Sequence, residues 1–514
     1  MSQPQQRYHD FMHIEQAPNN ELLSAAKRQA QAMHTSRLRL STLCEMQNLS
    51  YNETHKCWAM LTLQTDPVGK RPKRNNFVDF VVCIDLSASM KTQSKLAFVQ
   101  ASIEYLLDRL DERHRFSLVI FNHVVQQVTD LISCTQHNKE VIKRHLRGLT
   151  PNGSTNISGA LFKAIEILNR RGDTSGRIAS VMLFTDGLSN RGPTAGDTLA
   201  KLDKLQLPRG CIVNTFGYGR DHDSRMLHGI AMRSKGIYYY VETQDAIAAT
   251  FGECVAGILS TEAHQIVVSM RGQDGGRIVT LANPYPVIER RVAKDYDINL
   301  GLMYSGESKS LLFKMSLRKL RQPQPLHVLA LVTVKYVSTL TGRREIVQGA
   351  IQVRRPNICP AEPIPLHLDQ QINRYATAVT IQKAIGLAEK NNCAEGLNIL
   401  RDFSQRIRKS ASADQPYCED LLKDLEDVMK SMTNKQNFSG GIHMAYSLCA
   451  MYYMERSTGS RVLSKRDAQR HAGYGYVTVH QALEARNAMA SARSYVTGYA
   501  LKQGSLRHDP MDTN

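Results

Sequence analysis

The chain has 514 residues, a formal net charge of +18 and a hydrophobic content of 42%. This length exceeds what one hydrophobic core usually supports, so we expect about two to four domains. The hydrophobic content is typical of globular proteins and argues against a disordered chain. No apolar run reaches the length of a membrane span, and no signal peptide follows the first residues. These features predict a soluble intracellular protein, in the cytoplasm or alternatively in the nucleus.

The positive charge is spread along the chain. Nucleic-acid binders usually concentrate basic residues on one stripe or in a recognisable reading module, and we find no such module. We therefore do not expect a nucleic-acid partner, although the net charge favours attraction to acidic surfaces. The basic run Lys70–Arg74 is interpreted as a solvated linker, with a nuclear import signal or a phosphate-binding arm as alternatives.

Ten cysteines are present, and none of them forms a Cys-x-x-Cys pair. Several, such as Cys83 and Cys211, fall inside predicted core strands. We therefore expect reduced, buried thiols.

Short apolar runs alternate with segments of helical length in the first half of the chain. The runs cover residues 77–84, 115–121, 178–185, 211–216 and 237–241. After the first run, apolar residues from Leu96 to Leu110 recur in steps of three and four, which predicts a helix. Alternating strands and helices predict a mostly parallel sheet with helices on both faces.

Oxygen-bearing side chains stand where these predicted strands end. Asp85, Ser87 and Ser89 follow the first strand, Thr155 precedes a predicted helix, and Asp186 follows a later strand. In open α/β sheets, ligands bind beyond the carboxyl ends of the strands, so these loops can meet. Two carboxylates and three hydroxyls are hard ligands suited to Mg²⁺, with Mn²⁺ or Ca²⁺ as alternatives. Such a cation keeps most of its charge and attracts an acidic group from outside. For residues 85–89 alone, a helix-capping loop is the alternative.

In their order and spacing, these five residues resemble the von Willebrand factor A (VWA) domain with its metal-ion-dependent adhesion site, over residues 77–260. The segment from Asn214 to Val241 is similar to the intracellular plant branch that carries RING fingers. One departure is Ala88, where the family usually has Gly. The resemblance implies a Rossmann-like fold and a protein partner that presents Asp or Glu to the metal. The Cys and His ladder of a RING finger is missing here.

The segments on either side of residues 77–260 have a different hydrophobic periodicity. Alternation at residues 59–64, 310–317 and 347–353 predicts half-buried strands. The simplest architecture is a β-sandwich formed by residues 37–65 and 263–353, with the VWA domain inserted into it; the alternative is two unrelated β segments. Beyond residue 365, three apolar stripes with helical spacing predict a helical bundle.

We therefore predict a multidomain α/β plus β plus α protein. The predicted parts are a poorly ordered or helical N-terminal segment (1–36), the first sandwich strands (37–76), the VWA domain (77–260), the remaining sandwich (261–355), a C-terminal helical domain (366–503) and a tail (504–514).

Enzymatic interpretations lack support in the sequence. It has no phosphate-binding loop, zinc helix, nucleophile elbow or kinase signature. Asp221, His222 and Asp223 precede a predicted helix, where capping is the ordinary role of such residues. We therefore expect a non-enzymatic, cation-dependent protein-binding module or intracellular scaffold. The alternatives are a substrate-recruiting component of a ubiquitin-ligase assembly, and a scaffold in which the cation only stabilises the loops.

Overall fold

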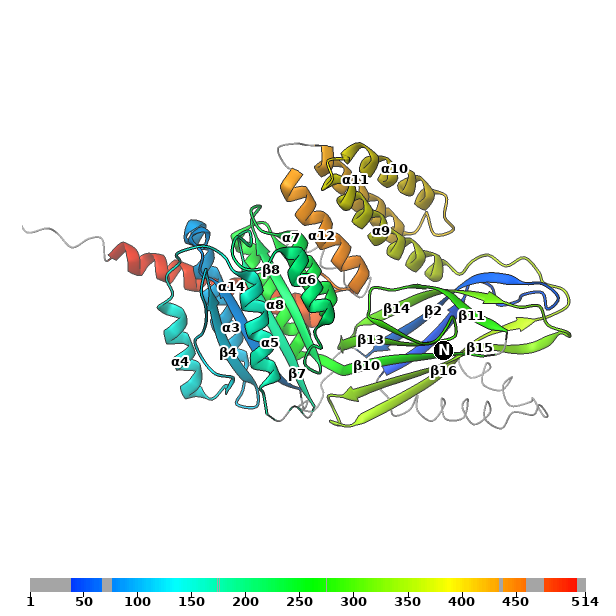
Figure 1. The fold of residues 1–514 in the computed structure, drawn as a ribbon, viewed down its shortest axis with the longest axis horizontal. Helices are drawn as coiled ribbons and strands as arrows, with labels where there is room; N and C mark the ends of the chain where they lie inside the picture. The colour runs from blue at the N-terminus through cyan, green and yellow to red at the C-terminus, as the bar shows by residue number, and fades with distance from the viewer. Residues whose placement is uncertain are drawn as a thin grey trace, which may run out of the picture.

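The computed structural model describes residues 38–66, 76–172, 174, 176–273, 275–433, 438–458 and 476–505. Three parts are visible in Figure 1: an α/β domain, a pair of antiparallel sheets and a group of helices. The predicted segment 1–36, the basic run Lys70–Arg74 and residues 506–514 of the predicted tail (504–514) lie outside the described residues, whereas residues 504 and 505 belong to the last described helix. Within the described residues, no helix combines the length and the hydropathy needed to cross a membrane.

The α/β domain is built on a sheet whose central strand is β3 (Phe77–Asp85). Every residue of β3 except Phe77 is buried, as expected for a parallel strand covered on both faces. Its parallel neighbours are β4 (Arg115–Phe121) and β7 (Arg177–Thr185), followed by β8 (Cys211–Tyr218) and β9 (Tyr238–Val241). The short strands β5 (Val125–Gln127) and β6 (Ile132–Ser133) pair antiparallel with β4. The connecting helices are η1 (Ala88–Ser94), α3 (Lys95–Arg109), α4 (Gln136–Arg147), α5 (Ile157–Asn169), α6 (Ala195–Lys204), α7 (Ser224–Arg233) and α8 (Gln244–Leu259).

Strands from both sides of the α/β domain share one sheet. This sheet has the order β1-β2-β14-β11, formed by β1 (Leu38–Cys44), β2 (His55–Thr65), β14 (Ser308–Leu317) and β11 (Gly276–Ala282). The pairing of Leu61 with Leu311 fixes the register of β2 on β14. The prediction that the α/β domain is inserted into a β-sandwich is therefore confirmed, and the alternative of two unrelated β segments is wrong.

A second antiparallel sheet has the order β12-β13-β10-β15-β16. It contains β10 (Thr261–Gly272), β12 (Val287–Arg291), β13 (Asp295–Tyr304), β15 (Gln324–Ser338) and β16 (Arg344–Arg355). Because β10 begins two residues after α8 ends, this sheet is joined directly to the α/β domain.

Four helices form the predicted bundle: α9 (Leu366–Ala388), α10 (Cys393–Arg408), α11 (Pro416–Thr433) and α12 (Phe438–Met454). Buried ion pairs attach the bundle to the first sheet. Glu307 accepts from Lys309 at 2.9 Å and from Arg456 at 2.6 Å, and all three side chains are almost fully buried. Charges can be buried at such a junction because each one has an opposite charge in contact.

The last described helix, α14 (Val479–Ser505), differs from the predicted arrangement. The sequence placed it in the C-terminal helical domain, whereas in the structure it packs on α8 and α3 of the α/β domain. The contact face consists of small residues, among them Ala485 and Ala488, which approach Gly252 of α8 closely. Polar contacts add to it, since Glu484 accepts from Tyr105 and Arg109 of α3 at 2.6 Å. The sequence alone does not reveal which helix a stripe of alanines packs against.

The α8–α14 contact predicts opposite effects for two glycine-to-alanine changes. A Cβ atom on Gly252 would lie 2.6 Å from the Cβ of Ala488, whereas one on Gly386 of α9 would meet nothing within 4 Å. Gly386→Ala should therefore stabilise the protein by up to about 1 kcal/mol through helix propensity, and Gly252→Ala should destabilise it by about 1–3 kcal/mol. Urea unfolding measures both, and proteolysis within residues 476–505 reports detachment of α14. Equal stabilisation by the two changes would contradict the close packing.

Buried histidines make the stability of the fold depend on pH. Burial lowers the pKa of His228 to about 4, and Nε2 of this ring has no hydrogen-bond partner within the described structure. Because its folded-state pKa lies below the unfolded value of about 6.5, His228 destabilises the protein as the pH falls below 6.5 and has no such effect above it.

Replacing His228 by Phe tests this dependence. The free energy of unfolding of His228→Phe, relative to wild type, should rise by about 1.4 kcal/mol per pH unit as the pH is lowered from about 6 toward 4.5. Urea titrations of both proteins across this range measure the difference, and other titrating groups cancel in it. A difference that is independent of pH would show that His228 is not held neutral.

Candidate metal centre

Three loops meet at the carboxyl edge of the parallel sheet. The first follows β3, the second precedes α5 and the third follows β7, which is paired with β3. The N–H of Ala88 donates to the carbonyl of Gly153 at 3.0 Å, which joins the first loop to the second. The N–H of Thr155 donates to the Asn190 side chain at 2.8 Å, which joins the second loop to the third. Two hydrogen bonds donated by backbone N–H groups therefore join the three loops.

The structure brings the five predicted site residues, Asp85, Ser87, Ser89, Thr155 and Asp186, to this junction. The Ser87 and Ser89 Oγ atoms are 3.1 Å apart, and Ser89 Oγ donates to Asp186 Oδ1 at 2.6 Å. A Cβ atom on Gly187 would lie 2.9 Å from Thr155 Oγ1 and 3.7 Å from Ser89 Oγ, so both hydroxyls approach the same stretch of backbone. Apart from Ser89, these side chains are buried.

Asp85 is oriented by two hydrogen bonds. The N–H of Ser87 donates to Oδ1 at 2.7 Å, and the Thr185 hydroxyl donates to Oδ2 at 2.5 Å. Burial, with a smaller contribution from the nearby charge of Asp186, raises the pKa of Asp85 to about 6 although these two bonds lower it. The protein therefore holds this carboxylate in place at some cost in desolvation, which a cation would offset.

Two residues that act on the site were missed in the sequence. Thr185 is the last residue of β7 and immediately precedes a predicted ligand. Lys95 begins α3, and its Nζ lies 2.7 Å from Asp186 Oδ2, with the Lys95 side chain 14% exposed. A signal for Lys95 was present, because a cation is unfavourable at a helix N-terminus unless something nearby compensates it.

Ala88 does not disturb the first loop. Its backbone is not in the left-handed region that favours glycine. The departure from the usual Gly therefore leaves the ligand positions intact.

The donor set fits a hard divalent cation. It offers two carboxylates and three hydroxyls, and the Lys95 ammonium already places a positive charge against Asp186. No group of three or more His, Cys, Asp or Glu side chains is arranged to hold a metal ion among the described residues, and this holds for the present site as well. The candidate site therefore depends on hydroxyl ligands.

Apolar side chains lie exposed around the same edge. Leu188 is 60% exposed and follows Asp186 by two residues. Val124 is 59% exposed, and its loop is joined to the second site loop through Asn122, which donates to the Asn152 side chain at 2.8 Å. Exposed apolar residues beside a polar centre are typical of a contact surface.

The segment Asp221–Asp223 has structural roles. Asp223 caps α7 by accepting from the N–H of Met226 at 2.9 Å, as the capping interpretation predicts. His222 is buried, and its Nε2 lies 2.6 Å from the Tyr238 hydroxyl. The ring also stacks on His443 of α12 at 4.2 Å, where the bundle meets the α/β domain.

Comparison with known proteins shows which family and which solved structures the α/β domain resembles. Residues 80–189 match the family model described as von Willebrand factor type A domain. Two solved structures share the fold: a von Willebrand factor type A protein from Catenulispora acidiphila (TM-score 0.59, 16% identity, 76% of this chain and 89% of that chain) and the ArnB paralog VWA2 from Sulfolobus acidocaldarius (TM-score 0.56, 13% identity, 81% and 99%).

The sequence relatives match a smaller share of this chain than the two solved structures do. The uncharacterized protein sll0103 of Synechocystis is 23% identical over 60% of this chain and 70% of its own length. The inter-alpha-trypsin inhibitor heavy chain H2 of Mesocricetus auratus is 32% identical over 34% of this chain, but only 18% of that protein is covered. The similarity to the heavy chains is thus confined to a small part of them.

The Lys95–Asp186 ion pair predicts how the site responds to a cation. Lys95→Met removes a positive charge that competes for Asp186, so it should lower the stability without metal and raise the affinity for Mg²⁺ by roughly tenfold, equivalent to about 1.4 kcal/mol. Thermal unfolding with Mg²⁺ and with a chelator measures both effects. Lys201→Met, whose ammonium lies over the Phe162 ring, is the control. Unchanged Mg²⁺ affinity in Lys95→Met would show that Lys95 and the cation do not compete.

Proposed function

We propose that this chain, whose α/β region is a von Willebrand factor type A domain, is a non-enzymatic protein-binding module or scaffold that captures an acidic side chain of its partner through a divalent cation. Domains of this family commonly mediate protein–protein interaction. The cation would be Mg²⁺, or alternatively Mn²⁺ or Ca²⁺, with Asp85, Ser87, Ser89, Thr155 and Asp186 as its ligands.

The observation that carries the proposal is the convergence of three hydroxyls and two carboxylates from three loops that the backbone holds together. Hydroxyls are neutral ligands, so they leave most of the charge of a bound cation uncompensated. When bound, such a cation supplies an open coordination position for a carboxylate oxygen. The exposed position of Ser89, together with the burial of Asp85 and Asp186, leaves the outer side of the site accessible to a partner.

The surroundings of the site favour a protein partner over a free small acid. Leu188 and Val124 present exposed apolar side chains beside it, and Arg191 is exposed on the third loop. Exposed apolar side chains near a binding centre are typical of protein interaction surfaces, where burial of apolar area supplies binding energy. Leu188 and Val124 would thus add binding energy that a lone carboxylate cannot supply.

The proposal assigns the candidate cation a binding role and no catalytic role. Metal-assisted hydrolysis requires a positioned base and a substrate pocket. The nearest basic side chain, Lys95, donates to Asp186 and is committed to that carboxylate. Binding is therefore the activity that the arrangement supports.

Substitution of the ligands tests the proposal. Asp85→Ala, Asp186→Ala and Thr155→Ala should each lower the affinity for Mg²⁺ or Mn²⁺ at least about tenfold. Each change removes a side chain that would bind the cation directly or would orient another ligand. All three should also abolish Mg²⁺-dependent capture of partner proteins from the cells of origin. Asp130→Ala, an exposed carboxylate elsewhere on the α/β domain, is the matched control. Calorimetric titration measures cation binding, and thermal unfolding checks that each variant is folded.

Two outcomes would contradict the proposal, and a third would favour the ubiquitin-ligase alternative. Partner capture that survives a chelator would exclude cation-mediated contact. Cation binding that stabilises the loops without changing capture would support the purely stabilising role instead. Capture of a ubiquitin-conjugating enzyme or ligase, lost in the Asp186→Ala variant, would identify the partner class as ubiquitin-ligase components.

A further inference from the structure

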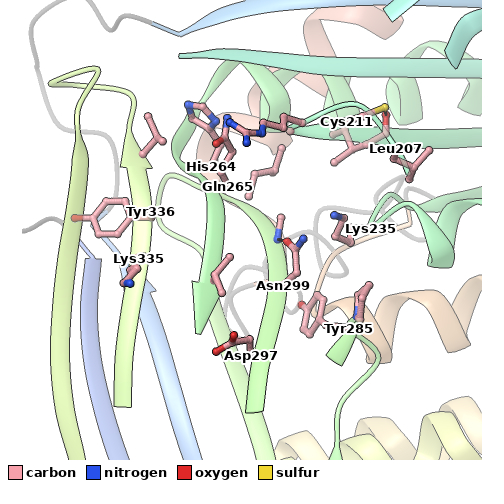
Figure 2. A pocket seen from close by; sticks show the side chains of 18 of the residues that line it. Leu207, Cys211, Lys235, His264, Gln265, Tyr285, Asp297, Asn299, Lys335 and Tyr336 are labelled. Carbon is pink, nitrogen blue, oxygen red and sulfur yellow. Dashed lines mark hydrogen bonds between the residues drawn. The ribbon is translucent and has the colours of Figure 1, made fainter. Parts of the chain in front are cut away.

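A cleft of about 1,180 Å³ separates the α/β domain from the second antiparallel sheet. One wall is formed by residues 202–212 and by the end of α7, and the other by β10, β13 and β15 (Figure 2). Cys211, the first residue of β8, lies in this cleft, so the cleft is at the amino edge of the parallel sheet. It is thus at the opposite end of the α/β domain from the candidate metal centre.

His264 of β10 lines the cleft with its hydrogen-bonding capacity unused. It is 1% exposed, and neither ring nitrogen has a hydrogen-bond partner among the described residues. Burial lowers its pKa to about 4, so the ring is neutral and carries one donor and one acceptor. Buried polar groups without partners are rare, because each one costs its full desolvation. A bound molecule in the cleft would satisfy this ring.

Lys235 enters the same cleft from an unusual backbone position. It directly follows the C-cap residue Ser234 of α7 and has φ +61°, where glycine or asparagine is normally found. Gly301 on the facing strand leaves room for it, because a Cβ there would lie 3.3 Å from Lys235 Cδ. Burial lowers the pKa of Lys235, and within the described residues it has no ion-pair partner. Figure 2 shows its ammonium pointing toward Asn299 above Tyr285.

A second strained residue lies on the opposite wall. Gln265 has φ +54° at a bulge of β10, immediately after His264. Lys235 and Gln265 are two of the six non-glycine residues with positive φ among those described, and both line this one cleft. Strained backbone of this kind clusters at ligand sites, where it aims side chains.

The charges lining the cleft are unbalanced. Its two aspartates are already paired, Asp203 with Arg233 at 2.7 Å and Asp297 with Arg271 at 2.7 Å. Glu345 accepts from the Tyr336 hydroxyl. A neutral hydroxyl leaves the charge of Glu345 in place, but Lys235, Arg209, Lys335 and Arg344 also line the cleft and form no ion pair within the described residues, so positive charge is in excess. Beside them are the apolar side chains of Leu205, Leu207, Met232 and Val267.

We propose that this cleft binds a small organic anion, with its carboxylate or phosphate group against Lys235 and its apolar body against the wall formed by residues 205–207 and Met232. His264 and Tyr285, whose hydroxyl is buried without a partner, supply further hydrogen bonds. The anion would lie between the inserted α/β domain and the sandwich and would fix their relative position. This proposal does not depend on the cation site.

Ligand-observed NMR with three probes tests the class of molecule. Benzoate and phenyl phosphate carry an apolar ring and an anionic group, and benzyl alcohol carries the ring alone. For fragments of this size we expect dissociation constants in the millimolar range, with both anions binding at least about fivefold more tightly than the alcohol. Comparison of benzoate with phenyl phosphate distinguishes a carboxylate site from a phosphate site. Binding of inorganic phosphate alone, equal to that of phenyl phosphate, would show that the apolar wall is not used.

Two variants separate binding from folding. Lys235→Gly relieves the positive φ, so it should raise the melting temperature while it weakens anion binding at least about tenfold. His264→Phe keeps the ring volume and removes the unsatisfied nitrogens, so it should also be stable and bind more weakly. Lys383→Met, an exposed lysine of α9, should change neither property.

The proposal is overturned if Lys235→Gly binds the anions as well as wild type does, or if no probe saturates at about 10 mM, the weak end of the expected range. Mg²⁺ titration of the Lys235→Gly variant should match that of wild type. Failure of the anion site therefore leaves the cation proposal unaffected, and failure of the cation proposal leaves the anion site unaffected.

Discussion

Two carboxylates that end neighbouring parallel strands cannot both stay ionised and buried without positive charge beside them. In this protein the carboxylates belong to Asp85 and Asp186, and the positive charge comes from Lys95 at the start of α3. The hydroxyls of Thr185 and Ser89 each donate to one of the carboxylates. This small cluster fixes the ends of β3 and β7 and the beginning of α3 at one place. Our proposal is that a divalent cation displaces the ammonium group from this position.

The rest of the structure is attached to the α/β domain at several points. The α/β domain is inserted between β2 and β10, so both of its ends are held by strands of the sandwich. The bundle is attached to the sandwich through the Glu307 ion pairs and to the α/β domain through the stacked rings of His222 and His443. As Figure 1 shows, the sandwich and the bundle lie to one side of the α/β domain. A partner at the metal edge and an anion in the cleft would thus contact the same domain at opposite ends.

Much of the fold is predictable from the sequence because the hydrophobic periods are strong. The continuous apolar run of β3 predicts a buried parallel strand, and this prediction is confirmed. The alternation at residues 310–317 correctly predicts a strand, but the expected half-burial is wrong, because residues 309–313 of β14 are all buried and Leu312 packs against Leu368 of α9. The five candidate ligands could be predicted because four of them stand at or just after the ends of β3 and β7, Thr155 precedes α5, and their order resembles that of a known family. The packing of α14 was not predictable, since its contact face is made of alanines that carry no strong hydrophobic pattern.

The residues missed in the sequence share one physical property, which is that long-range geometry decides their role. Lys95 and Asp186 are far apart along the chain, and only the folded sheet places their charges in contact. The same holds for Lys235 and His264, whose cleft exists only where two domains meet. Local spacing predicts elements and loops, whereas a charge pair or an interdomain cleft requires the arrangement of those elements.

Crystals of the protein grown with Mn²⁺, and recorded at a wavelength where manganese scatters anomalously, test the central claim most directly. The account predicts one anomalous peak at the edge of the sheet, bonded to Ser87, Ser89 and Thr155, with the Lys95 ammonium moved away from Asp186. An intact Lys95–Asp186 pair with no peak at saturating Mn²⁺ would contradict it.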